Sequence, residues 1–200
     1  YDVFSLPSGE LCVTVGDVAG SGLAAAVIMG RMRSALRAYA LETTDPAEVL
    51  GKLDRKMQHF EPDALATVLY AVIEPGLGRM HVALAGHFPP VIARPGEVAV
   101  LAGVQPGSMI GMGLQVRRPV STLPVPPGTL LCFYTDGLVE RRGEVIDDGL
   151  DRLCRAVTAE PAEAACAAVM AALVGNEPAR DDIALLMVRR QAGKEGDADA

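Results

Sequence analysis

The stretch Gly16-Asp17-Val18-Ala19-Gly20-Ser21-Gly22 joins a predicted strand to a predicted helix. Residues 11–15 before it are apolar and mostly β-branched, which is typical of a buried strand. The glycines allow the backbone to turn sharply after that strand. Asp17 is therefore expected at a rigid strand end, where a carboxylate suits Mg²⁺ or Mn²⁺. An amphipathic helix is predicted over 22–41 by apolar residues at helical spacing, namely Ile28, Met32, Ala35, Leu36 and Tyr39.

Acidic residues stand at the ends of two further predicted strands. The apolar run 130–135 is followed by Asp136-Gly137, and Asp181-Asp182 stands directly before the apolar run 183–188. Three acidic strand ends in one chain favour carboxylates that converge on a metal ion. Asp and Gly are also common turn residues, so three unrelated turn aspartates explain the pattern about as well when the residues are taken alone.

The composition indicates a single domain with an aliphatic core. The 200 residues are 50% hydrophobic but only 4% aromatic, and their formal net charge is −7. No basic run is present, which argues against a nucleic-acid partner, and no apolar run is long enough to span a bilayer. The four cysteines show no metal-type spacing and are expected to be buried small hydrophobes in a reduced, cytoplasmic protein: Cys12, Cys132, Cys154 and Cys166. One domain is predicted over 1–190, followed by a disordered polar tail over 191–200.

Turn and cap signals divide the rest of the chain into short strands and helices. A hairpin is predicted over 2–15, turning at Pro7-Ser8-Gly9, and a second helix begins at Pro46 with Asp45 as its cap. Strands at both ends with paired helices between them favour an α+β fold of sandwiched sheets. The remaining predicted strands cover 65–73, 79–84, 90–93, 98–101, 116–125, 129–134 and 183–189, and the remaining helices cover 148–157 and 161–173.

Four ordered motifs give the chain a specific resemblance. GDVAGSG at 16–22, AGHFPP at 85–90, FYTDGLVERR at 133–142 and RDDIALLMVRR at 180–190 resemble the metal-dependent type 2C (PPM) protein phosphatases. The pattern is most similar to the bacterial SpoIIE-type branch, which dephosphorylates anti-anti-sigma factors. This resemblance implies two packed antiparallel β-sheets flanked by helices, as in the α-β-β-α sandwich of that family.

The resemblance also implies a metal site. In the family pattern Asp17 bridges two Mn²⁺ or Mg²⁺ ions, the Val18 carbonyl adds a ligand, and Asp136 with Asp181 completes the shell of one ion. Asp182 does not match a ligand position. Such a pair of ions would lower the pKa of a shared water, so that a metal-bound hydroxide rather than a protein side chain attacks phosphorus. Substrate-binding residues stay unknown at this point.

The implied activity is that of a serine/threonine protein phosphatase in signal transduction. Its partner would be a phosphorylated anti-anti-sigma-type protein, neither a nucleic acid nor a membrane is expected as a partner, and a homodimer stays open. His87 is expected to be a hydrogen-bonded structural residue rather than a metal ligand. A nucleotide-binding reading of the glycines fails on their spacing.

Two departures from the family pattern keep a second function open. Ser21 stands where the family usually has His, and Ser cannot shuttle a proton near neutral pH. The chain starts at Tyr1-Asp2, after the point where the family's first strand carries another metal-binding Asp, so a longer parent protein with an upstream sensor domain is expected. The alternative is therefore a catalytically weak or inactive module that acts by binding proteins.

Overall fold

The computed structural model describes residues 1–114, 116–175 and 182–191, and the chain divides into two compact units. The first unit holds residues 1–89 and 103–124, and the second holds 90–102 and the chain from 125 onward. The prediction of one domain over 1–190 stays a prediction. Of the tail predicted over 191–200, residues 192–200 lie outside the described residues.

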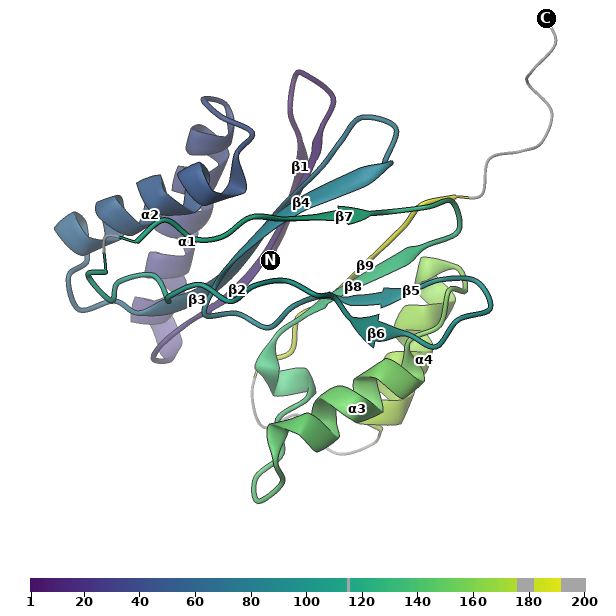
Figure 1. Cartoon of the computed structure of the whole chain (residues 1–200). Helices are drawn as coiled ribbons and strands as arrows, with labels where there is room; N and C mark the ends of the chain where they lie inside the picture. Colours follow the sequence, from purple (N-terminus) through teal and green to yellow (C-terminus); the bar gives the residue numbers. More distant parts are fainter. Residues whose placement is uncertain (115, 176–181, 192–200) are drawn as a thin grey trace, which may run out of the picture. The chain divides into compact units, whose positions relative to one another are not determined.

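The first unit contains a five-stranded antiparallel sheet in the order β1-β2-β3-β4-β7 (Figure 1). The predicted hairpin is confirmed, with Leu6 and Glu10 closing the turn through a 2.9 Å backbone hydrogen bond. The predicted strand over 116–125 is wrong in length, because regular pairing with β4 covers only four of its residues. The strands of this sheet are β1 (Asp2–Ser5), β2 (Leu11–Val18), β3 (Ala66–Ile73), β4 (Arg79–Ala85) and β7 (Ser121–Pro124).

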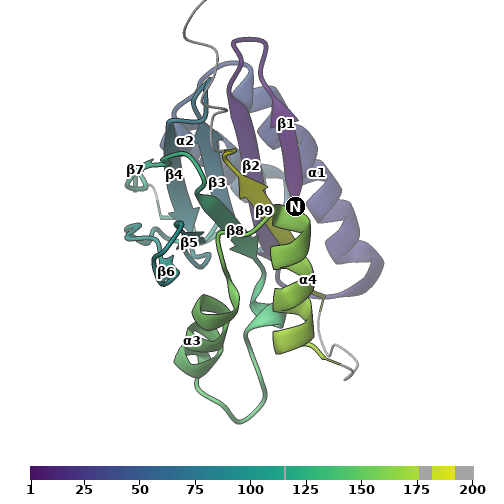
Figure 2. The same ribbon diagram turned by 90° about the vertical axis from the view of Figure 1, so that its right-hand side faces the viewer.

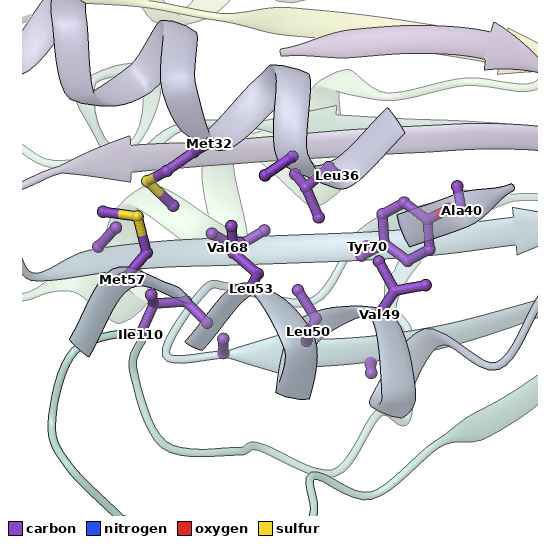
Figure 3. Packing of buried hydrophobic residues seen from close by; sticks show 14 of the residues in the cluster. Met32, Leu36, Ala40, Val49, Leu50, Leu53, Met57, Val68, Tyr70 and Ile110 are labelled. Atoms are coloured by element: carbon purple, nitrogen blue, oxygen red, sulfur yellow. The ribbon is translucent and has the colours of Figure 1, made fainter. Parts of the chain in front are cut away.

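Helices α1 (Gly22–Ala40) and α2 (Pro46–Phe60) lie side by side against this sheet (Figure 1), and the hydrophobic core of the unit lies between the helices and the sheet. Asp45 caps α2 as predicted, since its side chain accepts a 2.9 Å hydrogen bond from the Ala47 N–H. Figure 3 shows the apolar faces of both helices meeting β3. The labelled residues of this core are Met32, Leu36, Ala40, Val49, Leu50, Leu53, Met57, Val68, Tyr70 and Ile110.

The second unit contains a four-stranded antiparallel sheet in the order β6-β5-β8-β9. Helix α4 lies along β9 (Figure 2), and α3 packs on α4. The central strand β8 is buried throughout, as its apolar run predicts. The elements of this unit are β5 (Val91–Ala93), β6 (Val100–Leu101), β8 (Leu130–Tyr134), η1 (Asp136–Leu138), α3 (Ile146–Ala156), α4 (Ala162–Leu173) and β9 (Leu185–Arg189).

The predicted α+β class, with two antiparallel sheets and flanking helices, is confirmed. Cys12 and Cys132 are buried as predicted, Cys154 and Cys166 are half-buried, and all four are free thiols. Burial raises the pKa of the Cys132 thiol to about 12, so this thiol stays protonated at neutral pH. Within the described ranges, no helix is both long enough and apolar enough to cross a membrane.

Candidate metal centre

Asp17 lies at the end of β2, but the strand runs further than its apolar residues predict. It continues through Gly16 and Asp17 to Val18, with Asp17 opposite Thr67 of β3. Gly16 makes this extension possible, because a Cβ there would stand 2.4 Å from the Thr67 carbonyl oxygen. The Asp17 residue is exposed, whereas its neighbour Val18 is buried, as alternation along a strand requires.

The predicted sharp turn follows directly after β2. Gly20 and Gly22 adopt φ values of +113° and +74°, a region that residues with a Cβ rarely occupy. Ser21 between them is the extended N-cap residue of α1, and its hydroxyl does not cap the helix. The Ala19 N–H donates a 2.8 Å hydrogen bond to the Leu65 carbonyl, which holds the start of the loop on β3.

The Val18 carbonyl is turned away from β3. Because Ala19 and Leu65 form a hydrogen-bonded position of the ladder, the neighbouring pair Val18 and Ala66 is a non-hydrogen-bonded one. On the other side of β2, the pairing with β1 extends only as far as Thr14, so β1 does not pair with Val18. The strand end therefore offers a carboxylate and a backbone carbonyl within two residues, and both are oxygen donors of the kind that Mg²⁺ and Mn²⁺ prefer.

Asp136 follows β8 in the second unit and opens the short 3-10 helix η1. The residue is half-buried, and its Oδ1 accepts a 2.9 Å hydrogen bond from the Gly137 N–H. Among the described residues, none donates a hydrogen bond to the other carboxylate oxygen. A carboxylate held in place by a backbone N–H directly after a strand fits the role of a metal ligand.

The third acidic motif lies beside Asp136 in the second unit. The Thr135 hydroxyl donates a 3.2 Å hydrogen bond to the Asp182 carbonyl and accepts one of 2.9 Å from the Ala184 N–H. Thr135 thus joins its own motif to residues 47 and 49 positions further along the chain. Asp181, the predicted ligand of this pair, lies outside the described residues.

The described residues contain no complete metal-binding cluster, at these positions or elsewhere. Among the described residues, no group of three or more His, Cys, Asp or Glu side chains lies close enough together to hold a metal ion. His87 is buried, and its Nδ1 lies 3.0 Å from the Thr67 hydroxyl oxygen, as expected for a structural histidine. Arg141 donates a 2.7 Å hydrogen bond from Nη2 to the Leu173 carbonyl at the end of α4.

One buried polar pair escaped the sequence analysis. Arg118 and Asp54 form an ion pair of 2.8 Å, with only 2% and 6% of their side chains exposed. The sequence position of each residue indicated a buried charge. Asp54 directly follows Leu53 on the buried face of α2, and Arg118 falls within a predicted strand. A charge at an apolar position of a periodic pattern predicts a buried partner, but not which one.

Comparison with known proteins assigns the chain to a family. The sequence model of the family described as Stage II sporulation protein E (SpoIIE) matches residues 7–191. Protein IcfG of Synechocystis sp. is 26% identical over 188 residues, which cover 80% of this chain but 30% of IcfG.

Solved structures show the same fold. The RsbU and RsbW domains of Rv1364c from Mycobacterium tuberculosis share 28% identity at a TM-score of 0.83, over 96% of this chain and 54% of that one. The SiaA-PP2C domain of Pseudomonas aeruginosa shares 23% identity at a TM-score of 0.75, over 94% of this chain and 78% of that one. The chain thus spans about a third of IcfG and about half of the mycobacterial protein.

Proposed function

The chain belongs to the SpoIIE family of PP2C-like phosphatase domains, and we propose that it is a metal-dependent protein phosphatase that acts on phosphoserine or phosphothreonine of a regulatory protein. The observation that carries the proposal is the strand end of β2, where Asp17 and the outward-turned Val18 carbonyl stand in the family's glycine motif. The second family motif, with Asp136 fixed by the Gly137 N–H, supports it.

In this proposal four residues bind divalent metal: Asp17, Val18 through its carbonyl, Asp136 and Asp181. Two Mn²⁺ or Mg²⁺ ions, when bound, would supply Lewis-acid stabilisation of the phosphoryl oxygens and activation of a water. The chain's own part is to hold these oxygen donors rigidly at strand ends, with the Ala19–Leu65 hydrogen bond and the Asp136–Gly137 hydrogen bond fixing the two acidic positions. No side chain is needed as a nucleophile.

The proposed substrate is a phosphorylated anti-anti-sigma-type protein. The mycobacterial relative joins RsbU and RsbW domains in one chain, which supports a regulatory protein as the partner. Because the relatives are longer than this chain, sensing and targeting by other domains also belong to the proposal. A cytoplasmic location is part of it as well, and the four free thiols agree with a reducing compartment.

The test is hydrolysis of p-nitrophenyl phosphate and of a phosphoserine-containing anti-anti-sigma protein with Mn²⁺ present or chelated. We expect turnover only with Mn²⁺. Asp17→Asn should lower turnover and Mn²⁺ affinity by about 100-fold or more, because it removes a negatively charged oxygen donor that would bind the metal. Asp182→Asn, the matched control in the third motif, should change both by less than about 3-fold.

Three outcomes separate the alternatives. Undiminished hydrolysis in excess chelator would refute metal dependence. An equal loss of Mn²⁺ affinity by calorimetry in Asp17→Asn and Asp182→Asn would show that the ligand assignment is wrong. Mn²⁺ binding without hydrolysis of either substrate would favour a module that acts by binding proteins, in line with Ser21 at the family's histidine position.

A further inference from the structure

The buried ion pair of Asp54 and Arg118 lies in the first unit and joins α2 to the chain before β7. Arg118 Nη2 donates to Asp54 Oδ2 at 2.8 Å, and both side chains are almost fully buried. Burying two charges costs several kcal/mol in desolvation, and well-packed apolar residues often stabilise such a position as well or better. Stability alone is therefore a weak explanation for this pair.

Both partners also hold the backbone of one short segment, residues 108–111. Arg118 donates from Nε to the Ser108 carbonyl at 2.9 Å and from Nη2 to the Met109 carbonyl at 3.0 Å. Asp54 Oδ1 accepts a 2.9 Å hydrogen bond from the Gly111 N–H. The ion pair thus binds two backbone carbonyls and one backbone N–H of this segment, and two apolar side chains could not make these hydrogen bonds.

The segment 108–111 pairs with the first residue of β3. Ile110 forms an antiparallel bridge with Ala66, through hydrogen bonds of 3.1 Å and 2.9 Å in the two directions. Its side chain is fully buried and points toward Leu53 and Met57 of α2 (Figure 3). Gly111 comes so close to the chain just before β3 that a Cβ would stand 2.1 Å from the Ala64 carbonyl oxygen.

The end of β3 in turn holds the end of β2. Ala66 lies opposite Val18, Thr67 lies opposite Asp17, and the Leu65 carbonyl accepts the Ala19 N–H. The N–H and carbonyl of Ala66 point to Ile110 and not to Val18. The segment 108–111 therefore pairs with the edge of β3 that faces away from β2. Hydrogen bonds therefore connect the ion pair to Ala66, and the backbone of residues 65–66 carries this connection on to Ala19, which directly follows the proposed ligands Asp17 and Val18.

We propose that Asp54 and Arg118 are positioning residues for the metal-binding strand end, acting through residues 108–111 and Ala66. The proposal rests on the function proposed above only for its catalytic consequence. The mechanical part, that the pair orders the end of β2, stands on the hydrogen bonds alone. Partners that orient metal ligands without touching the metal commonly change metal affinity by 10- to 100-fold.

The decisive variant is the double substitution Asp54→Leu with Arg118→Met in the full chain. It removes both charges together, so no unpaired charge is left buried, and it keeps apolar volume at both positions. The matched control is Arg117→Met. Arg117 is the next residue and also pairs with α2, at 2.6 Å from Asp45, but 77% of its side chain is exposed.

The first measurement is amide hydrogen exchange at Ala19, Ala66 and Ile110 without metal. We expect protection at these three amides to fall by at least about 10-fold in the double variant, while amides in the middle of β2 and β3 keep theirs. The second is Mn²⁺ binding by calorimetry, where affinity should fall by about 10-fold. The third is hydrolysis of p-nitrophenyl phosphate, where kcat should fall and KM should stay.

Unchanged exchange at Ala19 and Ala66 in the folded double variant would overturn the proposal, as would equal changes in Arg117→Met. If the double variant does not fold, Arg118→Lys serves instead. It keeps the charge but cannot reach both carbonyls, so a positioning role predicts the same losses in weaker form, and wild-type behaviour refutes it. If even the wild type shows neither Mn²⁺ binding nor hydrolysis, the proposed function fails while the exchange data still decide the mechanical part.

Discussion

At the scale of single residues, the first strand is tied to α1 by one ion pair. Asp2 is nearly buried in β1 and accepts hydrogen bonds from Arg37 Nε at 2.6 Å and from Nη2 at 2.7 Å. The Arg37 guanidinium also lies 5.3 Å from the centre of the Phe4 ring. Hydrogen bonding by Arg37 holds the pKa of the Asp2 carboxyl below its ordinary value of 3.8, although partial burial opposes this shift.

This lowered pKa predicts how Asp2 contributes to stability as the pH changes. A carboxyl whose pKa is lower in the folded state stabilises the fold above its ordinary pKa, and it loses this effect as the pH falls through the folded-state pKa. Asp2→Asn should therefore lower the melting temperature at pH 7 by roughly 2–4 °C. The difference from wild type should shrink below pH 3.8. Thermal melts followed by circular dichroism at several pH values, with Asp151→Asn as an exposed control, would check this, and a pH-independent difference would contradict it.

At the scale of elements, α3 packs closely against the chain that follows Asp136 and η1. Gly149 on α3 faces the backbone of Val139, which follows η1, and a Cβ at Gly149 would stand 1.9 Å from the Val139 carbonyl oxygen. Gly51 on α2 is different, since a Cβ there would meet only the end of the Arg55 side chain, at 3.7 Å. The same residue type thus serves close packing in one helix and has no steric need in the other.

The two glycines predict opposite effects of the same substitution. Gly149→Ala should destabilise the fold by about 1–3 kcal/mol, because the added methyl must push α3 away from backbone atoms. Gly51→Ala should stabilise it by about 0.5–1 kcal/mol, because Ala loses less conformational entropy in a helix. Denaturant titration of both variants measures the difference. A stabilised Gly149→Ala variant would mean that α3 does not approach Val139 as described.

The same elements show what the sequence can and cannot predict. Helical periodicity predicted both bounds of α1 within one residue, and the Asp45-Pro46 cap predicted the start of α2, because these signals are local. The strand predicted over 116–125 is shorter in the structure, where it covers only residues 121–124. The prediction missed that Arg118 is buried against Asp54, 64 residues away in sequence. At the candidate site, the residue pattern correctly predicted Asp17 and Asp136 at strand ends, while Asp181 lies outside the described residues. The outward turn of the Val18 carbonyl depends on register with β3, which no local pattern contains.

At the scale of the whole molecule, each compact unit is assembled from separate stretches of chain. The first unit is closed by residues 103–124, which supply β7 at the edge of its sheet and Arg118 for its buried pair. Residues 1–89 alone would leave β4 as an open edge and the Asp54 carboxylate without its buried partner. The loss of one partner of a buried pair typically costs about 3–5 kcal/mol, a large share of the stability of a small domain.

The first unit should therefore fold alone only when both of its stretches are present. A chain of residues 1–89 joined by a short Gly-Ser linker to residues 103–124 contains the whole sheet, both helices and the ion pair. We expect it to unfold cooperatively on heating, with the near-ultraviolet signal of a packed core, because a compact unit with its own core can fold independently. Residues 1–89 alone should show neither property. If the joined chain is as unfolded as this control, the first unit depends on the second for its stability, and the strand end that carries Asp17 is ordered only in the complete chain.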